Sequence, residues 1–195
     1  MTVSKRLTLA VLCIALVFCT TLSVQVSARQ NAAGGFTYAA PLSNRAWQWF
    51  ADEFGSYTSM PNLLHGINNF GIANFRYTQQ DYFFVQTFYP DRFLFEVPFE
   101  GVCYEFACFV KSAVLVWAEE NQVEDVKCFV YSVKLDEDSY HAVNFIYQGE
   151  DLYYIDITTN TTRAKEGGDG KRILKLGCTI DEYIEKCGWE LVAVH

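Results

Sequence analysis

The chain has 195 residues, enough for one domain, and its 23 acidic and 15 basic residues give a formal net charge of −8. This acidity argues against nucleic acid or an anionic membrane surface as a partner, because both attract cationic patches. Aromatic residues make up 16% of the sequence, which favours a well-packed core.

The first 28 residues have the pattern of a secretory signal peptide. Lys5 and Arg6 precede an apolar stretch that continues to Val24, and small residues at 26–28 give a cleavage pattern. We therefore expect a secreted, extracellular protein whose mature part has a formal charge of −10, from 13 basic and 23 acidic residues. The apolar stretch is also just long enough for an uncleaved anchor, so a membrane-anchored form is the alternative. No later stretch is long and apolar enough to cross a bilayer.

A flexible N-terminal lead is expected at 29–42, followed by a single domain at 43–195. Ser43 or Asn44 can cap a helix that runs to about Phe54. Gly55 is then expected to end this helix, as a glycine just after a helix commonly does.

A second helix is expected from Pro61 to about Asn69, because proline suits a first helical turn. The aromatic-rich segment that follows is interrupted by Pro90 and Pro98. We expect an extended stretch at 74–78 and then a long loop. Such a loop can form a wall of a substrate cleft, or its aromatic side chains can cover the core.

Apolar residues at helical spacing predict one buried helix over 102–121, after which the apolar period changes to two. Thr179 with Glu182 forms a capping box for a short last helix. Helices that precede an antiparallel sheet indicate an α+β fold, with helices packed on that sheet. The expected strands are Lys127–Lys134, His141–Tyr147, Leu152–Ile157, Arg172–Leu176 and Glu190–Val194.

Five cysteines lie in the expected mature part: Cys103, Cys108, Cys128, Cys178 and Cys187. An odd number leaves at least one thiol without a disulfide partner inside the chain. Pairings Cys178–Cys187 and Cys108–Cys128 would leave Cys103 free, but spacing alone does not establish connectivity. The cysteine and histidine spacing does not suit a zinc tetrad, so we expect no metal cofactor.

Cys103 lies in the first turn of the expected 102–121 helix. Backbone N–H groups and the positive end of the helix dipole stabilise an anion there, which favours a reactive thiolate. The same amides can hold a tetrahedral oxyanion, with the Cys103 N–H as the first candidate. Cys108 is the rival nucleophile, but it lies further along the helix and suits a core thiol or a disulfide.

His141 and Asp156 flank a predicted hairpin whose turn lies at 148–151. A loop of two or four residues pairs positions whose numbers sum to 299, so that His141 faces Thr158 and shares a face with Asp156. A three-residue loop would place His141 and Asp156 on opposite faces. A lone strand histidine is usually structural, but a carboxylate in an apolar strand needs a partner, which favours a His141–Asp156 pair.

Three motifs occur in order: Gly-Val-Cys at 101–103 with Ala107, His-Ala-Val-Asn at 141–144, and Tyr-Tyr-Ile-Asp-Ile-Thr at 153–158. Together they resemble the transglutaminase-like superfamily of papain-like cysteine enzymes, in a bacterial-type single-domain form. Val143 departs from the family pattern, which usually has tryptophan at this position. Nothing in the sequence resembles the calcium sites of animal transglutaminases.

This resemblance implies a papain-like core with the nucleophile at the N-terminus of a buried helix. It implies Cys103 as nucleophile, His141 as general base and acid, and Asp156 as the residue that orients His141, with a thioester intermediate and no cofactor. The substrate would be a protein or peptide amide. Water as acceptor gives a protease or deamidase, and an amine gives a transglutaminase. The alternatives are a non-catalytic extracellular binding module that keeps the fold, and a purely structural disulfide-bonded protein.

Overall fold

A computed structural model describes residues 29–30, 36–39, 42–78, 87–88, 94, 98–158 and 173–195. The expected signal peptide at 1–28 therefore lies outside the described residues. So do most of the expected long loop before Gly101 and residues 159–172.

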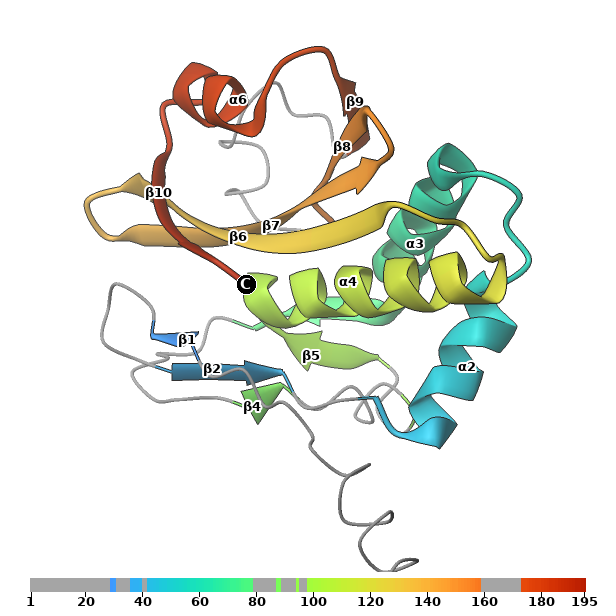
Figure 1. Ribbon diagram of the computed structural model, residues 1–195. Helices are drawn as coiled ribbons and strands as arrows, with labels where there is room; N and C mark the ends of the chain where they lie inside the picture. The colour runs from blue at the N-terminus through green and yellow to red at the C-terminus, as the bar shows by residue number, and fades with distance from the viewer. Residues whose placement is uncertain are drawn as a thin grey trace, which may run out of the picture.

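The centre of the fold is a five-stranded sheet that is antiparallel throughout, in the order β10-β6-β7-β8-β9 (Figure 1). All five expected strands are present, with ends shifted by only a few residues. Together with the helices, the sheet confirms the expected α+β class. The strands are β6 (Val126–Asp136), β7 (Ser139–Gln148), β8 (Asp151–Ile155), β9 (Ile173–Leu176) and β10 (Glu190–Val194).

Both faces of this sheet are buried, each against a different helix. Helix α4 (Cys103–Glu120) covers one face and the short helix α6 (Ile180–Lys186) covers the other (Figure 1). Successive side chains of a strand point to opposite faces, so Ala142 and Ile146 join the cluster around α4 while Val143 and Phe145 join the cluster around α6. This two-sided burial explains why β7 is buried without interruption from His141 to Ile146.

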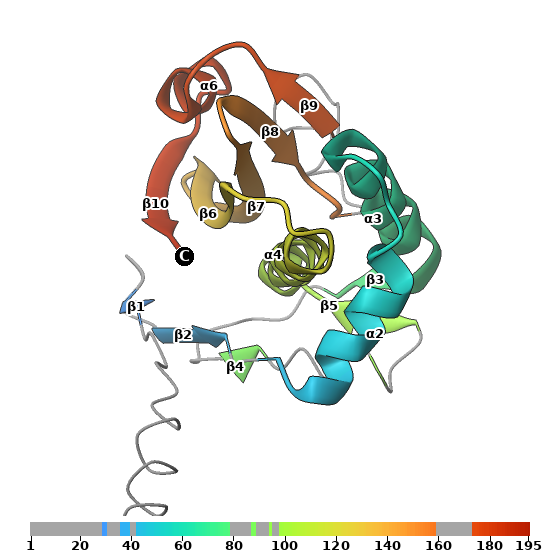
Figure 2. The same cartoon turned by 45° about the vertical axis from the view of Figure 1, so that its right-hand side comes forward.

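Helices α2 (Asn44–Phe54) and α3 (Met60–Asn74) pack beside α4 (Figure 2). The Ser43 hydroxyl accepts a hydrogen bond from the Ala46 N–H at 3.1 Å, which confirms Ser43 as the cap of α2. Gly55 ends α2 as expected: it is the C-cap residue, with φ −64°, and its N–H donates to the Ala51 carbonyl. A side chain at Gly55 would collide with that carbonyl oxygen, so the lack of space is what requires glycine.

Helix α3 is longer than expected, because it continues past Asn69 to Asn74. It leads directly into β3 (Phe75–Tyr77), which pairs in parallel with β5 (Phe99–Gly101). The Gly101 carbonyl also accepts a hydrogen bond from the Thr78 N–H at 2.9 Å. A parallel pair therefore fixes the chain immediately before α4, where the sequence indicated only a loop.

Short strands also lie in the expected N-terminal lead. Strand β1 (Arg29–Gln30) pairs antiparallel with β2 (Phe36–Ala39), and β2 pairs in parallel with β4 (Thr87–Phe88). The three strands form a separate small sheet (Figure 1). This small sheet joins the expected N-terminal lead to β4, which lies in the segment between Tyr77 and Gly101.

The last helix has the expected capping box. The Thr179 N–H donates to Glu182 Oε2 at 2.8 Å, and the Thr179 hydroxyl accepts from the Glu182 N–H at 3.3 Å. Helix α6 separates Cys178 from Cys187, which caps its C-terminal end. At 1.5 Å rise per residue these cysteines are roughly 12 Å apart, well beyond the 7 Å Cα limit for a disulfide. The considered Cys178–Cys187 pairing does not fit this fold, and no disulfide joins any two of the five cysteines among the described residues.

Candidate active site

Cys103 is the first residue of α4 and is half-buried. The residue before it, Val102, has no polar side chain with which to cap the helix. Instead, Glu105 in the first turn reaches back, and its Oε2 accepts a hydrogen bond from the Val102 N–H at 3.0 Å. A side chain at Gly101 would lie 2.7 Å from Glu105 Oε2, so glycine leaves room for this buried carboxylate. Glu105, a residue of the first turn of α4 itself, therefore stabilises the turn that carries Cys103.

The hairpin of β7 and β8 has the register that the sequence predicted. Asn144 pairs with Ile155 and Gln148 with Asp151, so that paired numbers sum to 299. The two-residue turn contains Gly149 at φ +58°, a conformation that glycine adopts readily. Continuation of this alternation beyond β8 places Asp156 on the same face as His141.

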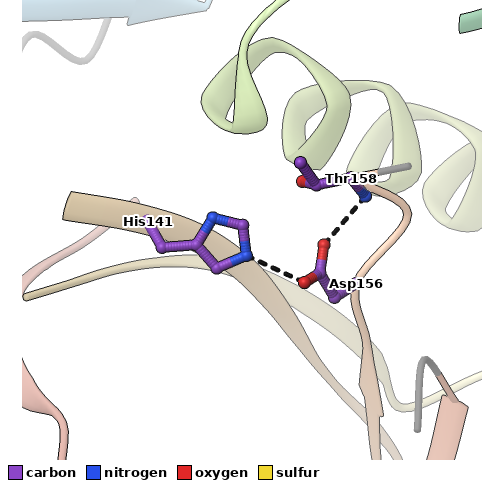
Figure 3. Close-up of polar contacts among 3 residues, drawn as sticks. All are labelled: His141, Asp156 and Thr158. Atoms are coloured by element: carbon purple, nitrogen blue, oxygen red, sulfur yellow. Dashed lines mark hydrogen bonds and ion pairs between the residues drawn. The ribbon is translucent and has the colours of Figure 1, made fainter. Parts of the chain in front are cut away.

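His141 and Asp156 form a buried pair (Figure 3). The Nε2 atom of His141 lies 2.8 Å from Asp156 Oδ2, and the two side chains are only 2% and 6% exposed. The other carboxylate oxygen, Oδ1, accepts a hydrogen bond from the Thr158 N–H at 2.8 Å. Both oxygens of Asp156 are therefore held, which fixes the carboxylate and with it the plane of the imidazole.

The two groups shift each other's pKa values in opposite directions. Burial lowers the pKa of His141, but the charge and hydrogen bond of Asp156, with a smaller contribution from Cys103, outweigh it and raise this pKa to about 10. Burial raises the pKa of Asp156, but the charge and hydrogen bond of His141 and the Thr158 contacts outweigh it, so the net shift is downward. At neutral pH the pair is an imidazolium and a carboxylate.

Cys103 is the third member of this group. Its thiol acts on His141 both through a hydrogen bond and through charge. Asp156 already engages Nε2 of the imidazole, so Nδ1 is the ring nitrogen left for Cys103. The structure therefore brings together all three residues that the sequence singled out.

The rival cysteine lies in a very different environment. Cys108 is buried, and burial raises its pKa to about 12; the same holds for Cys128 on β6. A thiol of this kind stays protonated at physiological pH and is a poor nucleophile. The other histidines also lie elsewhere: His65 is exposed on α3, and the His195 ring contacts Ser132 and Tyr104.

Sequence reasoning did not identify the supporting residues Thr158, Glu105 and Asn144. Each carries a polar group that is buried in the folded chain. A buried polar group usually has a partner, but the sequence alone does not show which positions are buried. Thr158 and Asn144 did lie inside the quoted motifs, which was the available signal.

Neither a membrane-spanning helix nor a metal-binding cluster is present among the described residues. Within 29–30, 36–39, 42–78, 87–88, 94, 98–158 and 173–195, no helix has the length and apolar character of a membrane span. In the same part of the chain, no group of three or more histidine, cysteine or acidic side chains is arranged to hold a metal ion.

The buried pair predicts how stability depends on pH. The raised pKa of His141 means that its contribution is full below 6.5 and is lost as the pH rises toward 10. The lowered pKa of Asp156 means that its contribution is full above 3.8 and is lost as the pH falls further. Thermal unfolding followed by circular dichroism should therefore show the highest midpoint between about pH 4 and 6.5.

A His141→Ala variant distinguishes the loss of stability caused by deprotonation of His141 from the loss caused by ionisation of the buried thiols. The unfolded thiols of Cys108 and Cys128 ionise near pH 9, while their pKa values in the folded protein are about 12, so they destabilise the fold only above pH 9. The variant should lose the decline between pH 6.5 and 9 and keep the decline above pH 9. An unchanged slope between pH 6.5 and 9 would contradict the charged state assigned to His141.

The site brings a thiol together with an imidazole whose orientation is fixed. The thiol lies at a helix N-terminus, the imidazole is oriented by a carboxylate, and backbone N–H groups of the first helical turn lie nearby. Comparisons with protein-family models, with curated proteins and with solved structures find no match to this chain.

Proposed function

We propose that this protein is an exported cysteine enzyme that acts on protein or peptide amides through a thioester intermediate. One arrangement carries the proposal: the buried His141–Asp156 pair, 2.8 Å apart, acts together with Cys103 at the first position of α4. A nucleophile, a base within its reach and a third group that orients the base are the signature of nucleophilic catalysis.

In the first half of the proposed reaction, the Cys103 thiolate attacks the carbonyl carbon of the amide and forms a C–S bond. Negative charge develops on the carbonyl oxygen, where the Cys103 N–H at the start of α4 is placed to donate. The C–N bond then breaks, and the leaving amine or ammonia takes a proton from the His141 imidazolium. The product is a thioester between Cys103 and the acyl group.

In the second half, water or a primary amine attacks the thioester. His141, now neutral, accepts the proton of the attacking group, and the C–S bond breaks to restore the Cys103 thiolate. Throughout the cycle Asp156 stays ionised and holds the imidazole in one orientation. Water gives hydrolysis and an amine gives transfer, and the same three side chains serve both reactions.

The motif resemblance supports this proposal and suggests a transglutaminase-like core. Val143, which replaces the family's usual tryptophan, is fully buried in the cluster around α6. This difference from the family pattern therefore affects the packing of the core and leaves the three proposed catalytic residues unchanged. The pattern of residues 1–28 supports secretion, with membrane anchoring as the alternative.

Alkylation of the thiols tests the proposal directly. Protein purified without the first 28 residues is treated with iodoacetamide from pH 5.5 to 9, and the modified cysteines are mapped by mass spectrometry. Cys103 should react selectively, and at pH 6 about tenfold or more faster than in a His141→Ala variant, because the imidazolium maintains its thiolate. Cys108 and Cys128 should stay unmodified in the folded protein, since both are buried.

The next assay tests turnover and distinguishes the acceptors. The protein is incubated with a glutamine-containing peptide, with and without a primary amine, and the masses of the products are measured by mass spectrometry. A gain of the amine indicates transfer, while deamidation or chain cleavage indicates hydrolysis, and Cys103→Ser is the inactive control. If Cys103 reacts slowly and independently of His141, the enzyme proposal is wrong and the non-catalytic binding module is the better description.

A further inference from the structure

A buried amide connects the helix that carries Cys103 to the strands of the sheet. Asn144 on β7 is only 1% exposed, and its Nδ2 donates to the Ala107 carbonyl of α4 at 2.9 Å. The same nitrogen donates to the Phe129 carbonyl of β6 at 3.3 Å and lies 3.7 Å from Cys128 Sγ. One side chain thus joins three elements of the fold.

The connected residues lie close to the site along both elements. Ala107 is four residues, or about one helical turn, after Cys103. Asn144 is three residues after His141 on the same strand. Any change in the spacing between α4 and β7 at Asn144 therefore changes the separation of Cys103 and His141.

The other contacts between α4 and β7 do not fix the distance between these two elements as sharply. Around Asn144 the facing side chains are apolar, such as Ala142 and Ile146 on β7 and Ala107 on α4. Apolar contacts are non-directional, whereas a buried hydrogen bond has a narrow range of length and angle. The amide is therefore the directional contact that links this part of α4 to the sheet.

We propose that Asn144 is a positioning residue that sets Cys103 against His141 by tying α4 to β7 and β6. The inference rests on the proposed function, because positioning matters only if Cys103 and His141 act together. Reactive groups lose one to two orders of magnitude in rate when displaced by about 1 Å, so a single amide can have a large effect from outside the site.

An Asn144→Leu variant tests the proposal, since leucine has nearly the same shape, no charge and no N–H donor. Ile146→Val and Ile146→Ala serve as matched controls, because Ile146 is buried on the same strand and face and belongs to the apolar cluster around α4. In each variant, Cys103 alkylation by iodoacetamide is measured from pH 5.5 to 9, and stability is measured by urea unfolding. If Asn144→Leu does not fold, Asn144→Thr provides a smaller change that also removes the amide.

The expected result is a roughly 10- to 100-fold slower alkylation of Cys103 in Asn144→Leu at pH 6.5. The upper limit arises because an ordinary thiol with a pKa near 8.5 is only about 1% ionised at this pH. The pH dependence of the Cys103 alkylation rate should also move toward that of an ordinary thiol, and a loss of stability alone would not cause this change. The Ile146 variants should keep the wild-type profile even when they are equally destabilised.

Two outcomes would overturn the proposal. Either Asn144→Leu keeps the wild-type rate and pH profile, or an Ile146 variant of equal stability shows the same change, which would assign the effect to general loosening of the core. Failure of the proposed function looks different, because the wild-type protein itself would then show no His141-dependent reactivity at Cys103. In that case there is no pair to position, and both proposals are wrong.

Discussion

Replacement of Asp156 by alanine is expected to lower the free energy of unfolding by about 3–5 kcal/mol, because it leaves the His141 imidazolium buried without its counter-charge. His141→Ala should have a loss of similar size, since it leaves the carboxylate unpaired. The double variant should lose less than the sum of the two, by about 1–3 kcal/mol, because it removes both members of one interaction. Urea unfolding at pH 6 measures all three values.

The pair of Lys175 and Asp151 provides the control. Its atoms are as close, at 2.7 Å, but the side chains are 58% and 46% exposed. Water screens such a pair, so Lys175→Ala should change stability little. Additive losses at His141 and Asp156 would show that the two groups do not interact as the 2.8 Å contact implies. In Asp156→Ala, Cys103 should also alkylate more slowly at pH 6, since the imidazole is no longer oriented.

The second large effect is expected in the core, at Phe109 of α4. Its ring lies among five aromatic rings with centroid distances of 4.9–6.1 Å, and its side chain is fully buried. Phe109→Ala should lower the free energy of unfolding by about 3–5 kcal/mol, through lost transfer energy and the cavity left behind. The rings come from α2, α3 and β3: Trp49, Phe50, Phe54, Phe70 and Phe75.

Leu115→Ala on the same helix is the matched control, because Leu115 is 39% exposed. It removes apolar atoms from α4 without opening a cavity, so its effect on urea unfolding should be far smaller. Equal losses in the two variants would contradict the assignment of Phe109 to the centre of this cluster. Both variants should keep His141-dependent alkylation of Cys103 as long as they are folded, because neither residue belongs to the site.

Local chemistry explains which elements could be predicted from the sequence. The helix at 102–121 was predicted from apolar spacing, and α4 differs from it by one residue at each end. The last helix was predicted from a capping box of Thr179 and Glu182, which is present. In both cases the deciding interactions join residues three or four positions apart, so they can be read within a short window.

Elements that depend on distant partners were missed or misjudged. Strand β5 exists because it pairs with β3, more than twenty residues earlier, and no local pattern marked it. The pairing of Cys178 with Cys187 was plausible from spacing and fails because a helix separates them.

For the candidate site, the sequence by itself determined the hairpin register. The two-residue turn at Gly149 and the alternation of side chains are local, and they place His141 and Asp156 on one face. Only the tertiary structure decided that Cys103 meets this pair, that Cys108 is buried with a raised pKa, and that Asn144 ties helix to sheet. The physical reason is that burial, charge interactions and hydrogen bonds between α4 and the sheet form only after segments distant in sequence have packed together.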